Sequence, residues 1–299
     1  MPVVAFRCPK CSQRVEFEQA IEHFSEIHPV MYHATVQSLI SQQDDERRQK
    51  GAGLSASIAC GDATCRRKVC LQRFYDYVLD PRMVEEAEEG NVIHSAMHKR
   101  GSGGVWVYET PLPGPGDEGK PGVRRNPGGW FEYEMFPGVW VSAIVDAHTQ
   151  DWSTIDDLMT QRASRTVRSP ELSHKVQLNI AKFLAEKLGY GPVKRLRIWK
   201  YQRGCYEPEN RHKVFEFEEK DVWDEGALRL ACEDHLTSLA GFLDNLDQLS
   251  GEPQEYLDAY MKKVPMDGDI HKLFNGKMCS QYCEVRDLCF KLAGKVSFY

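Results

Sequence analysis

The chain has 299 residues, and 38 Lys and Arg stand against 44 Asp and Glu, so its formal net charge is −6. This balance excludes a uniformly basic nucleic-acid coat protein, although local basic patches remain compatible with it. Hydrophobic residues make up 41% and charged residues 27%, as in a globular protein with a sizeable core. We see neither a run of roughly 20 apolar residues nor a secretory signal, and so expect a cytoplasmic, reducing location and no membrane contact.

The ten cysteines are the unusual part of the composition. In a reducing compartment, short-spaced cysteines indicate metal ligation more often than disulfides. Only Cys205 and Cys232 stand alone, and the others form three groups: Cys8 and Cys11; Cys60, Cys65 and Cys70; Cys279, Cys283 and Cys289.

The N-terminal group predicts a zinc finger over residues 1–41. Cys8 and Cys11 have two residues between them, and His23 and His28 follow with four residues between them, which is a ligand spacing typical of Zn²⁺ sites. His33 is an alternative to His28. The expected finger helix contains several glutamates, so it suits a protein partner better than a phosphate backbone. A charged and then Gly-containing segment, 42–57, predicts a linker.

Residues 58–299 predict a single mixed α/β domain. A Pro/Gly-rich stretch at about 101–129 is expected to form a surface loop. Hydrophobic patterns then predict, in order, a strand over 139–147, a helix over 172–188 that ends before Gly189, strands over 196–202 and 214–218, and a helix over 227–249. This order favours a mixed central sheet flanked by helices.

Several short motifs appear along this domain in a fixed order. Cys65 is followed by basic residues, Gly90 and His94 are separated by three residues, a predicted strand ends near Asp146, Asp156 and Asp157 follow it, and Gln177 lies early in the predicted helix. The three late cysteines close the series. Over about 55–299 this order resembles the iron–sulfur branch of the RecB-like PD-(D/E)XK nucleases, which includes CRISPR-adaptation and AddB-type nucleases. Single chains of this family often belong to phages or mobile elements.

The resemblance implies a restriction-endonuclease-like fold with a strand over 155–160. It also implies a metal-dependent DNA nuclease, an exonuclease acting on single-stranded ends. It implies that Cys65, Cys279, Cys283 and Cys289 hold a [4Fe–4S] cluster, with Cys70 as the alternative to Cys65 and zinc as the alternative to iron–sulfur. It also implies that His94, Asp146 and Asp157 bind Mg²⁺ or Mn²⁺ and that Gln177 orients the site.

The family's catalytic lysine is missing from its expected position. If Asp157 is the second acid, Met159 occupies the lysine position, and if Asp156 is, Leu158 does. Lys182 or Lys200 could supply the missing cation. Alternatively, the chain is a catalytically degenerate module that binds nucleic acid or serves as an assembly subunit.

A basic run follows the predicted helix and is interleaved with aromatic residues. Cations that follow a backbone and aromatics that stack on bases suit single-stranded nucleic acid, DNA or RNA. The alternative is a solvated strand edge whose aromatic side chains lie in the core. The residues predicted to bind nucleic acid are Lys194, Arg195, Arg197, Lys200, Tyr201 and Arg203.

Overall fold

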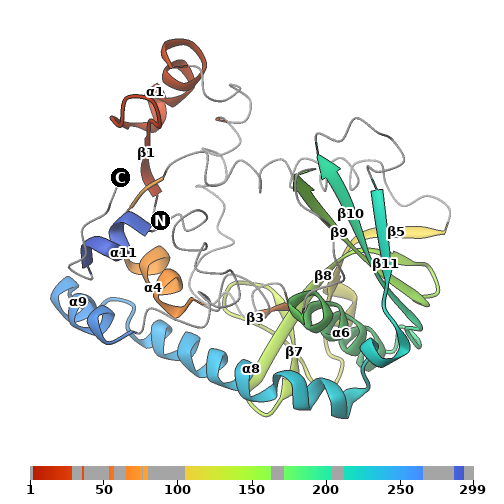
Figure 1. Cartoon of the computed structure of the whole chain (residues 1–299). Helices are drawn as coiled ribbons and strands as arrows, with labels where there is room; N and C mark the ends of the chain where they lie inside the picture. Colours follow the sequence, from red (N-terminus) through yellow and green to blue (C-terminus); the bar gives the residue numbers. More distant parts are fainter. Residues whose placement is uncertain are drawn as a thin grey trace. The chain divides into compact units, whose positions relative to one another are not determined.

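A computed structural model of the chain describes residues 3–28, 36, 54–56, 65–75, 77–79, 105–162, 172–203, 212–264 and 286–292 (Figure 1). The chain divides into two compact units. The first consists of Met1–Gln49, Asp62–Glu89 and Asp244–Tyr299, and the second of Lys50–Gly61 and Gly90–Leu243. Among the described residues, no helix combines the length and apolar character that crossing a bilayer requires.

The first unit begins with a small β-hairpin and a short helix. Strand β1 (Val3–Arg7) pairs with β2 (Arg14–Val15) in antiparallel fashion and with β4 (Tyr77–Leu79) in parallel, and α1 (Phe17–Glu22) continues into a π-helical turn, η1 (His23–Ile27). Phe6 and Phe24 are fully buried, and the Phe17 ring lies 5.1 Å from that of Phe6. These aromatic side chains form the core of this part.

The first unit also contains three helices that pack on one another. They are α4 (Arg66–Phe74), α9 (Gln254–Lys263) and α11 (Arg286–Leu292). Leu71 of α4 and Leu257 of α9 are buried, and the Tyr75 hydroxyl donates to Asp258 at 2.7 Å. The helices therefore bring chain segments nearly two hundred residues apart into one packed group.

The second unit is built on an eight-stranded sheet, with the order β11-β10-β9-β8-β7-β6 and with β3 and β5 also paired to β8. Parallel pairs (β9–β10, β3–β8) occur beside antiparallel ones, so the mixed α/β fold expected from the sequence is confirmed. Between the parallel strands β9 and β10 the chain forms α6 (Leu172–Lys187), as parallel connections require.

The strands are β3 (Leu54–Ser55), β5 (Trp106–Leu112), β6 (Val123–Arg125), β7 (Phe131–Phe136), β8 (Val139–Thr149), β9 (Thr154–Arg162), β10 (Arg195–Arg203) and β11 (His212–Glu216). Two 3-10 turns, η5 (Pro115–Asp117) and η6 (Glu219–Asp221), and the long helix α8 (Glu225–Gln248), whose residues belong to both units, complete the elements.

The central elements follow from their sequence patterns. In β8, Val141, Ala143 and Val145 are buried at alternate positions, while Ile144 between them is exposed. Helix α6 ends at Lys187, and Gly189 just beyond it has a φ of +83°, the left-handed conformation that closes many helices. The strands and helices predicted over 139–249 are all present, with ends shifted by a few residues.

The stretch at about 101–129 differs from the loop we expected. Two strands, β5 and β6, lie within it. In the described residues β5 pairs only with β8, so Pro111 occupies an edge strand, where a missing backbone N–H is tolerated.

Candidate functional site

Two groups of side chains could carry chemistry, one in each unit. In the first unit, one ligand atom from each of Cys8, Cys11, His23 and His28 lies within 4.8 Å of all the others. Cys8 and Cys11 flank a tight turn between β1 and β2, in which the Ser12 N–H donates to the Cys8 carbonyl at 2.8 Å.

The two histidines are held by the π-helical turn. The His28 N–H donates to the His23 carbonyl at 2.7 Å, which is the i to i+5 bond of a π-helix. This wider turn places residues five apart on the same side, and so the two imidazoles lie side by side with ring centroids 5.0 Å apart. The four-residue spacer between the histidines thus has a direct structural reason.

The distances in this group match tetrahedral metal coordination. With Zn–S near 2.3 Å and Zn–N near 2.0–2.1 Å, a tetrahedral site has S···N separations of about 3.6 Å and N···N separations of about 3.3 Å. Cys8 Sγ lies 3.7 Å from His28 Nδ1, Cys11 Sγ lies 3.6 Å from His23 Nε2, and the two nitrogens lie 3.2 Å apart. These four residues could hold a metal ion such as zinc.

In the second unit, two acids face each other on adjacent strands. Antiparallel β8 and β9 pair Ala147 with Asp156 and His148 with Ile155, and the same register continues to Asp146 opposite Asp157. The backbone ladder stops before this pair. Instead, Asp146 Oδ2 accepts the Leu158 N–H at 2.7 Å, so the carboxylate is held across the gap between the strands.

Helix α6 adds a third predicted residue to this pair. Gln177, in the second turn of α6, donates from Nε2 to Asp157 Oδ1 at 3.2 Å. All three side chains are half-buried. Asp146, Asp157 and Gln177, which we selected from three separate motifs, therefore converge on one place in the fold.

The neighbouring acid, Asp156, has a different environment. Its carboxylate accepts two hydrogen bonds from Arg197, at 2.8 and 2.7 Å, and one from the Trp199 indole at 2.8 Å. Hydrogen bonding to Asp156 raises the pKa of Arg197. Because successive strand residues point to opposite faces, Asp156 and Asp157 cannot share a site. Asp156 is bound into a buried ion pair, and this pairing favours the alignment in which Asp157 is the second acid.

The two candidate lysines lie in different surroundings. In the parallel β9–β10 register Lys200 pairs with Met159 and Ile198 with Asp157, so Lys200 shares a strand face with Asp157. Only 8% of Lys200 is exposed, and its ammonium lies 5.7 Å from the Phe215 ring centroid.

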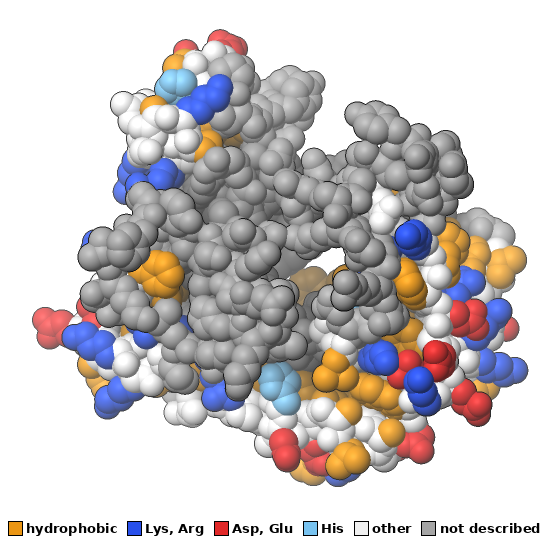
Figure 2. All heavy atoms as spheres, viewed as in Figure 1, with side chains coloured by type: hydrophobic (Ala, Val, Ile, Leu, Met, Phe, Trp, Pro, Cys, Tyr) orange, Lys and Arg blue, Asp and Glu red, His pale blue; other side chains and the backbone are white. Residues whose placement is uncertain are grey.

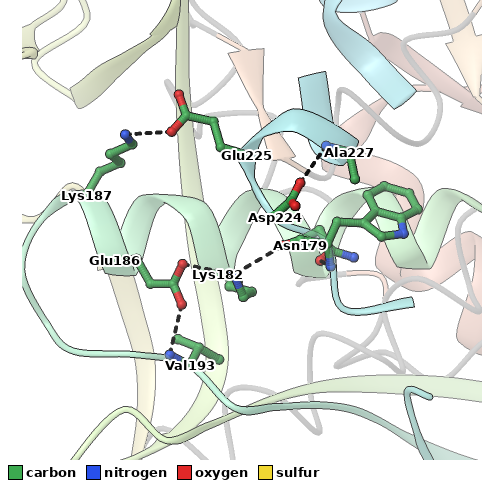
Figure 3. Close-up of polar contacts among 9 residues, drawn as sticks. Asn179, Lys182, Glu186, Lys187, Val193, Asp224, Glu225 and Ala227 are labelled. Carbon is green, nitrogen blue, oxygen red and sulfur yellow. Dashed lines mark hydrogen bonds and ion pairs between the residues drawn. The ribbon is translucent and has the colours of Figure 1, made fainter. Parts of the chain in front are cut away.

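Lys182 lies at a cavity of about 260 Å³ between α6 and the start of α8. Its ammonium donates to Glu186 at 2.9 Å and to the Trp223 carbonyl at 3.1 Å (Figure 3). Lys187 pairs with Glu225 beside it, at 2.8 Å. Lys182 is thus bound at the surface of α6 that faces α8.

The residues predicted to bind nucleic acid differ in exposure, because successive side chains of a strand point to opposite faces of the sheet. Lys194 and Arg195 are exposed, and Arg195 also donates to the Thr154 hydroxyl at 3.2 Å. Arg197 is paired with Asp156, Lys200 is buried and Tyr201 is half-buried, while the side chain of Arg203 lies outside the described residues. On the face drawn in Figure 2, acidic and basic side chains lie interspersed over the second unit.

Two of the cysteines predicted to hold a cluster lie on helices that pack together. Cys65 caps the N-terminus of α4, where its Sγ accepts the Lys68 N–H at 3.4 Å, and Cys289 is buried in α11, which contacts α4. Cys70 is fully buried, and burial together with the nearby Cys65 raises the pKa of its thiol to about 12. Cys279, Cys283 and His94 lie outside the described residues.

The sequence did not predict that Arg67 is buried. Only 5% of it is exposed, and one of its terminal nitrogens donates to the Val264 carbonyl at 3.2 Å. Its Nε is buried without a hydrogen-bond partner in the described part of the chain. The only signal for it was the basic run directly after Cys65.

No protein-family model matches the chain, and no curated protein matches it. The crystal structure of SSO0001 is similar over 68% of this chain and 84% of its own, with 16% identity and a TM-score of 0.40. A similarity this low carries no conclusion about fold or function.

Proposed function

We propose that the chain is a metal-dependent DNA nuclease of the RecB-like PD-(D/E)XK type, acting as an exonuclease on single-stranded ends. The observation that carries the proposal is the convergence of Asp146, Asp157 and Gln177. Each comes from a different motif. The Leu158 N–H orients the Asp146 carboxylate, and a hydrogen bond between their side chains orients Gln177 and Asp157.

The acids fit a divalent metal by their chemistry. Carboxylate oxygens are the ligands that Mg²⁺ and Mn²⁺ prefer, and a histidine suits Mn²⁺ as well. In the proposal Asp146 and Asp157 bind the ion, and His94 completes the set. Such an ion, when bound, lowers the pKa of an attacking water and neutralises charge on the scissile phosphate.

The chain's own residues position these ligands. The Leu158 N–H fixes the Asp146 carboxylate, and the Gln177 amide fixes that of Asp157. Both carboxylates are held on strands of the central sheet, so their separation does not depend on a loop.

Lys200 replaces the absent motif lysine in this proposal. It stands next to Met159 on the adjoining strand and on the face that carries Asp157. A buried cation at this place would stabilise negative charge that develops on the phosphate, an effect of about 10²–10³ in rate by analogy with oxyanion-hole donors. The position of Lys200 on the strand face that carries Asp157 favours it over Lys182, which lies at the cavity between α6 and the start of α8.

The first test is cleavage of a labelled DNA single strand with Mn²⁺, with Mg²⁺ and with EDTA. We expect cleavage that needs a divalent ion and is lost in Asp146→Asn and Asp157→Asn. Asp234→Asn, an exposed acid on α8, serves as the matched control and should cleave normally. Metal-independent cleavage, or equal loss in the control, would contradict the proposal.

The second test relocates the lysine. Lys200→Met should reduce the rate about 10²–10³-fold, and adding Met159→Lys to this variant should restore part of it. Lys187→Met, which removes an exposed cation of α6 that is paired with Glu225, is the control. Full activity in Lys200→Met together with loss in Lys182→Met would assign the role to Lys182 instead.

Two further metals belong to the proposal. The finger residues Cys8, Cys11, His23 and His28 hold zinc, which would supply folding energy to a part too small for a large core. Cys65, Cys279, Cys283 and Cys289 hold a [4Fe–4S] cluster. The packing of α4 on α11 and the buried cation Arg67, two residues after Cys65 in the chain, support this assignment, since such clusters with four thiolates are anionic.

Metal analysis tests both assignments. We expect zinc that is lost in Cys8→Ser, and iron with acid-labile sulfide that is lost in Cys65→Ser but kept in Cys70→Ser. A colourless protein purified without oxygen, with zinc at both sites, would overturn the iron–sulfur assignment.

The second candidate function is a degenerate module that binds nucleic acid without cutting it. Met159 in the lysine position favours it. Binding of single strands with no cleavage under either metal would select this candidate.

A further inference from the structure

One face of strand β8 is open beside the proposed metal site. From 139 to 147 the odd-numbered residues of β8 are buried, while the even-numbered residues between them are half-buried or exposed. Successive side chains of a strand point to opposite faces of the sheet. Trp140, Ser142, Ile144 and Asp146 therefore stand in one row on one face, and the row ends at a carboxylate of the proposed site.

Ile144 gives this row an apolar surface next to Asp146. Its side chain is 58% exposed, although β8 pairs with both β5 and β9. Two residues along a strand span about 6.7 Å, which separates Ile144 from Asp146 along β8. Pro111 is paired with Ile144 across the β5–β8 ladder, so it lies on the same face, and it is exposed as well. Exposed apolar side chains at the rim of a polar site are typical of a ligand-binding surface.

The other end of the row is formed by Trp140 together with Arg124 of β6. The guanidinium carbon of Arg124 lies 4.0 Å from the Trp140 ring centroid, a short cation–π contact. Arg124 Nε also donates to Glu132 Oε2 at 3.0 Å, and Glu132 is buried. Nearly half of the Arg124 side chain remains exposed. A guanidinium plane that two contacts fix in this way is a surface on which a nucleic-acid base can stack.

The charges along the row favour bases over phosphates. Ser142 and Ile144 in its middle are uncharged. Glu134, which pairs with Trp140 across the β7–β8 ladder, is exposed and accepts the Gly138 N–H at 2.9 Å. A phosphate chain gains nothing from lying directly on such a row. Bases present apolar π-faces, and in a single strand these faces are free to pack on protein side chains.

We propose that this row holds a nucleic-acid single strand by its bases: one base packs on Ile144 and Pro111 beside Asp146, and another stacks on the Arg124 guanidinium above Trp140. Every base has a π-face, so these contacts are tolerant of sequence. Ile144 and Arg124 are thus positioning residues that align the strand with the proposed metal site. The identity of the polymer rests on the proposed nuclease function, but the contacts are tested by binding alone.

The test is fluorescence anisotropy in EDTA, with a labelled oligothymidine and with a strand of the same length that lacks bases. Ile144→Ala should raise Kd for oligothymidine about 5-fold because apolar contact is lost, and Ile144→Phe should keep the affinity or increase it. Arg124→Lys keeps the charge but lacks the guanidinium plane, so it should raise Kd roughly 5-fold or more at unchanged salt dependence. Neither Ile144→Ala nor Arg124→Lys should change Kd for the strand without bases. Val214→Ala, which removes a comparably exposed aliphatic side chain from β11, is the matched control.

The outcomes separate these contacts from the proposed catalysis. Equal affinity of Ile144→Ala and the unaltered chain for oligothymidine, an equal loss in Val214→Ala, an equal loss for the strand without bases, or no oligothymidine binding at all would overturn the inference. Weakened oligothymidine binding by Ile144→Ala in a protein that cuts no DNA would support the row and contradict the nuclease function. Cleavage with a KM that Ile144→Ala leaves unchanged would do the reverse.

Discussion

The adjacent acids Asp156 and Asp157 of β9 should respond differently when each is replaced by asparagine. The substitution of Asp156 should lower stability, and that of Asp157 should abolish cleavage. In Asp156→Asn the Arg197 guanidinium loses its counter-charge, and the carboxylate that accepts bonds from Arg197 and Trp199 is gone. Breaking a buried ion pair costs about 3–5 kcal/mol, and we take the lower end, about 3 kcal/mol, because 17% of the Arg197 side chain is exposed. Asp157 is half-buried and accepts a 3.2 Å bond from Gln177, so Asp157→Asn should cost at most about 1 kcal/mol.

The assay is thermal unfolding followed by circular dichroism, beside cleavage of a labelled single strand. At about 2–4 °C per kcal/mol for a unit of this size, Asp156→Asn should lower Tm by roughly 6–12 °C, and Asp157→Asn by no more than about 4 °C. Cleavage at a temperature where both variants are folded should be lost only in Asp157→Asn. If Asp156→Asn melts like the unaltered chain and no longer cleaves, the two acids have been assigned the wrong way round.

Three further predictions concern other parts of the chain. Cys11→Ser should lose zinc and the protease resistance of residues 3–28, and unchanged zinc content would contradict the ligand set. Burial and the bond to Asp117 raise the pKa of Tyr190 to about 12. The stability that this shift contributes is therefore present below pH 10 and is lost as pH rises toward 12. In urea titrations at alkaline pH, Tyr190→Phe should reduce this fall in the free energy of unfolding between pH 10 and 12. Cys70, whose thiol pKa is about 12, should resist iodoacetamide at pH 8 in the folded protein and react in urea, and rapid labelling of the folded protein would refute its burial.

Structural features that depend on local sequence patterns could be predicted from the sequence. The cluster of Cys8, Cys11, His23 and His28 could be predicted because side chains that can share one metal ion have a restricted spacing within a short segment. The central strands and helices follow from their hydrophobic periods, and the end of α6 follows from Gly189.

Features that depend on strand register could not be predicted. The choice between Asp156 and Asp157 depends on Arg197, a residue some forty positions away that pairs with Asp156 across the parallel strands. The pairing of Lys200 with Met159 depends on the same register of β9 and β10. The sequence did not predict strand β5 because a proline within a segment argues against a strand. The pairing of β5 with β8 stabilises it despite this proline, and a partner strand cannot be recognised from the local sequence.

The most direct test of the proposed nuclease site is the cleavage of a labelled DNA single strand by the full chain and by Asp157→Asn, with Mn²⁺. We expect progressive shortening of the strand from an end by the full chain and an intact strand with Asp157→Asn, although the variant binds DNA and melts within a few degrees of the parent. An intact strand with both proteins, or equal cleavage by both, would contradict the assignment of this site.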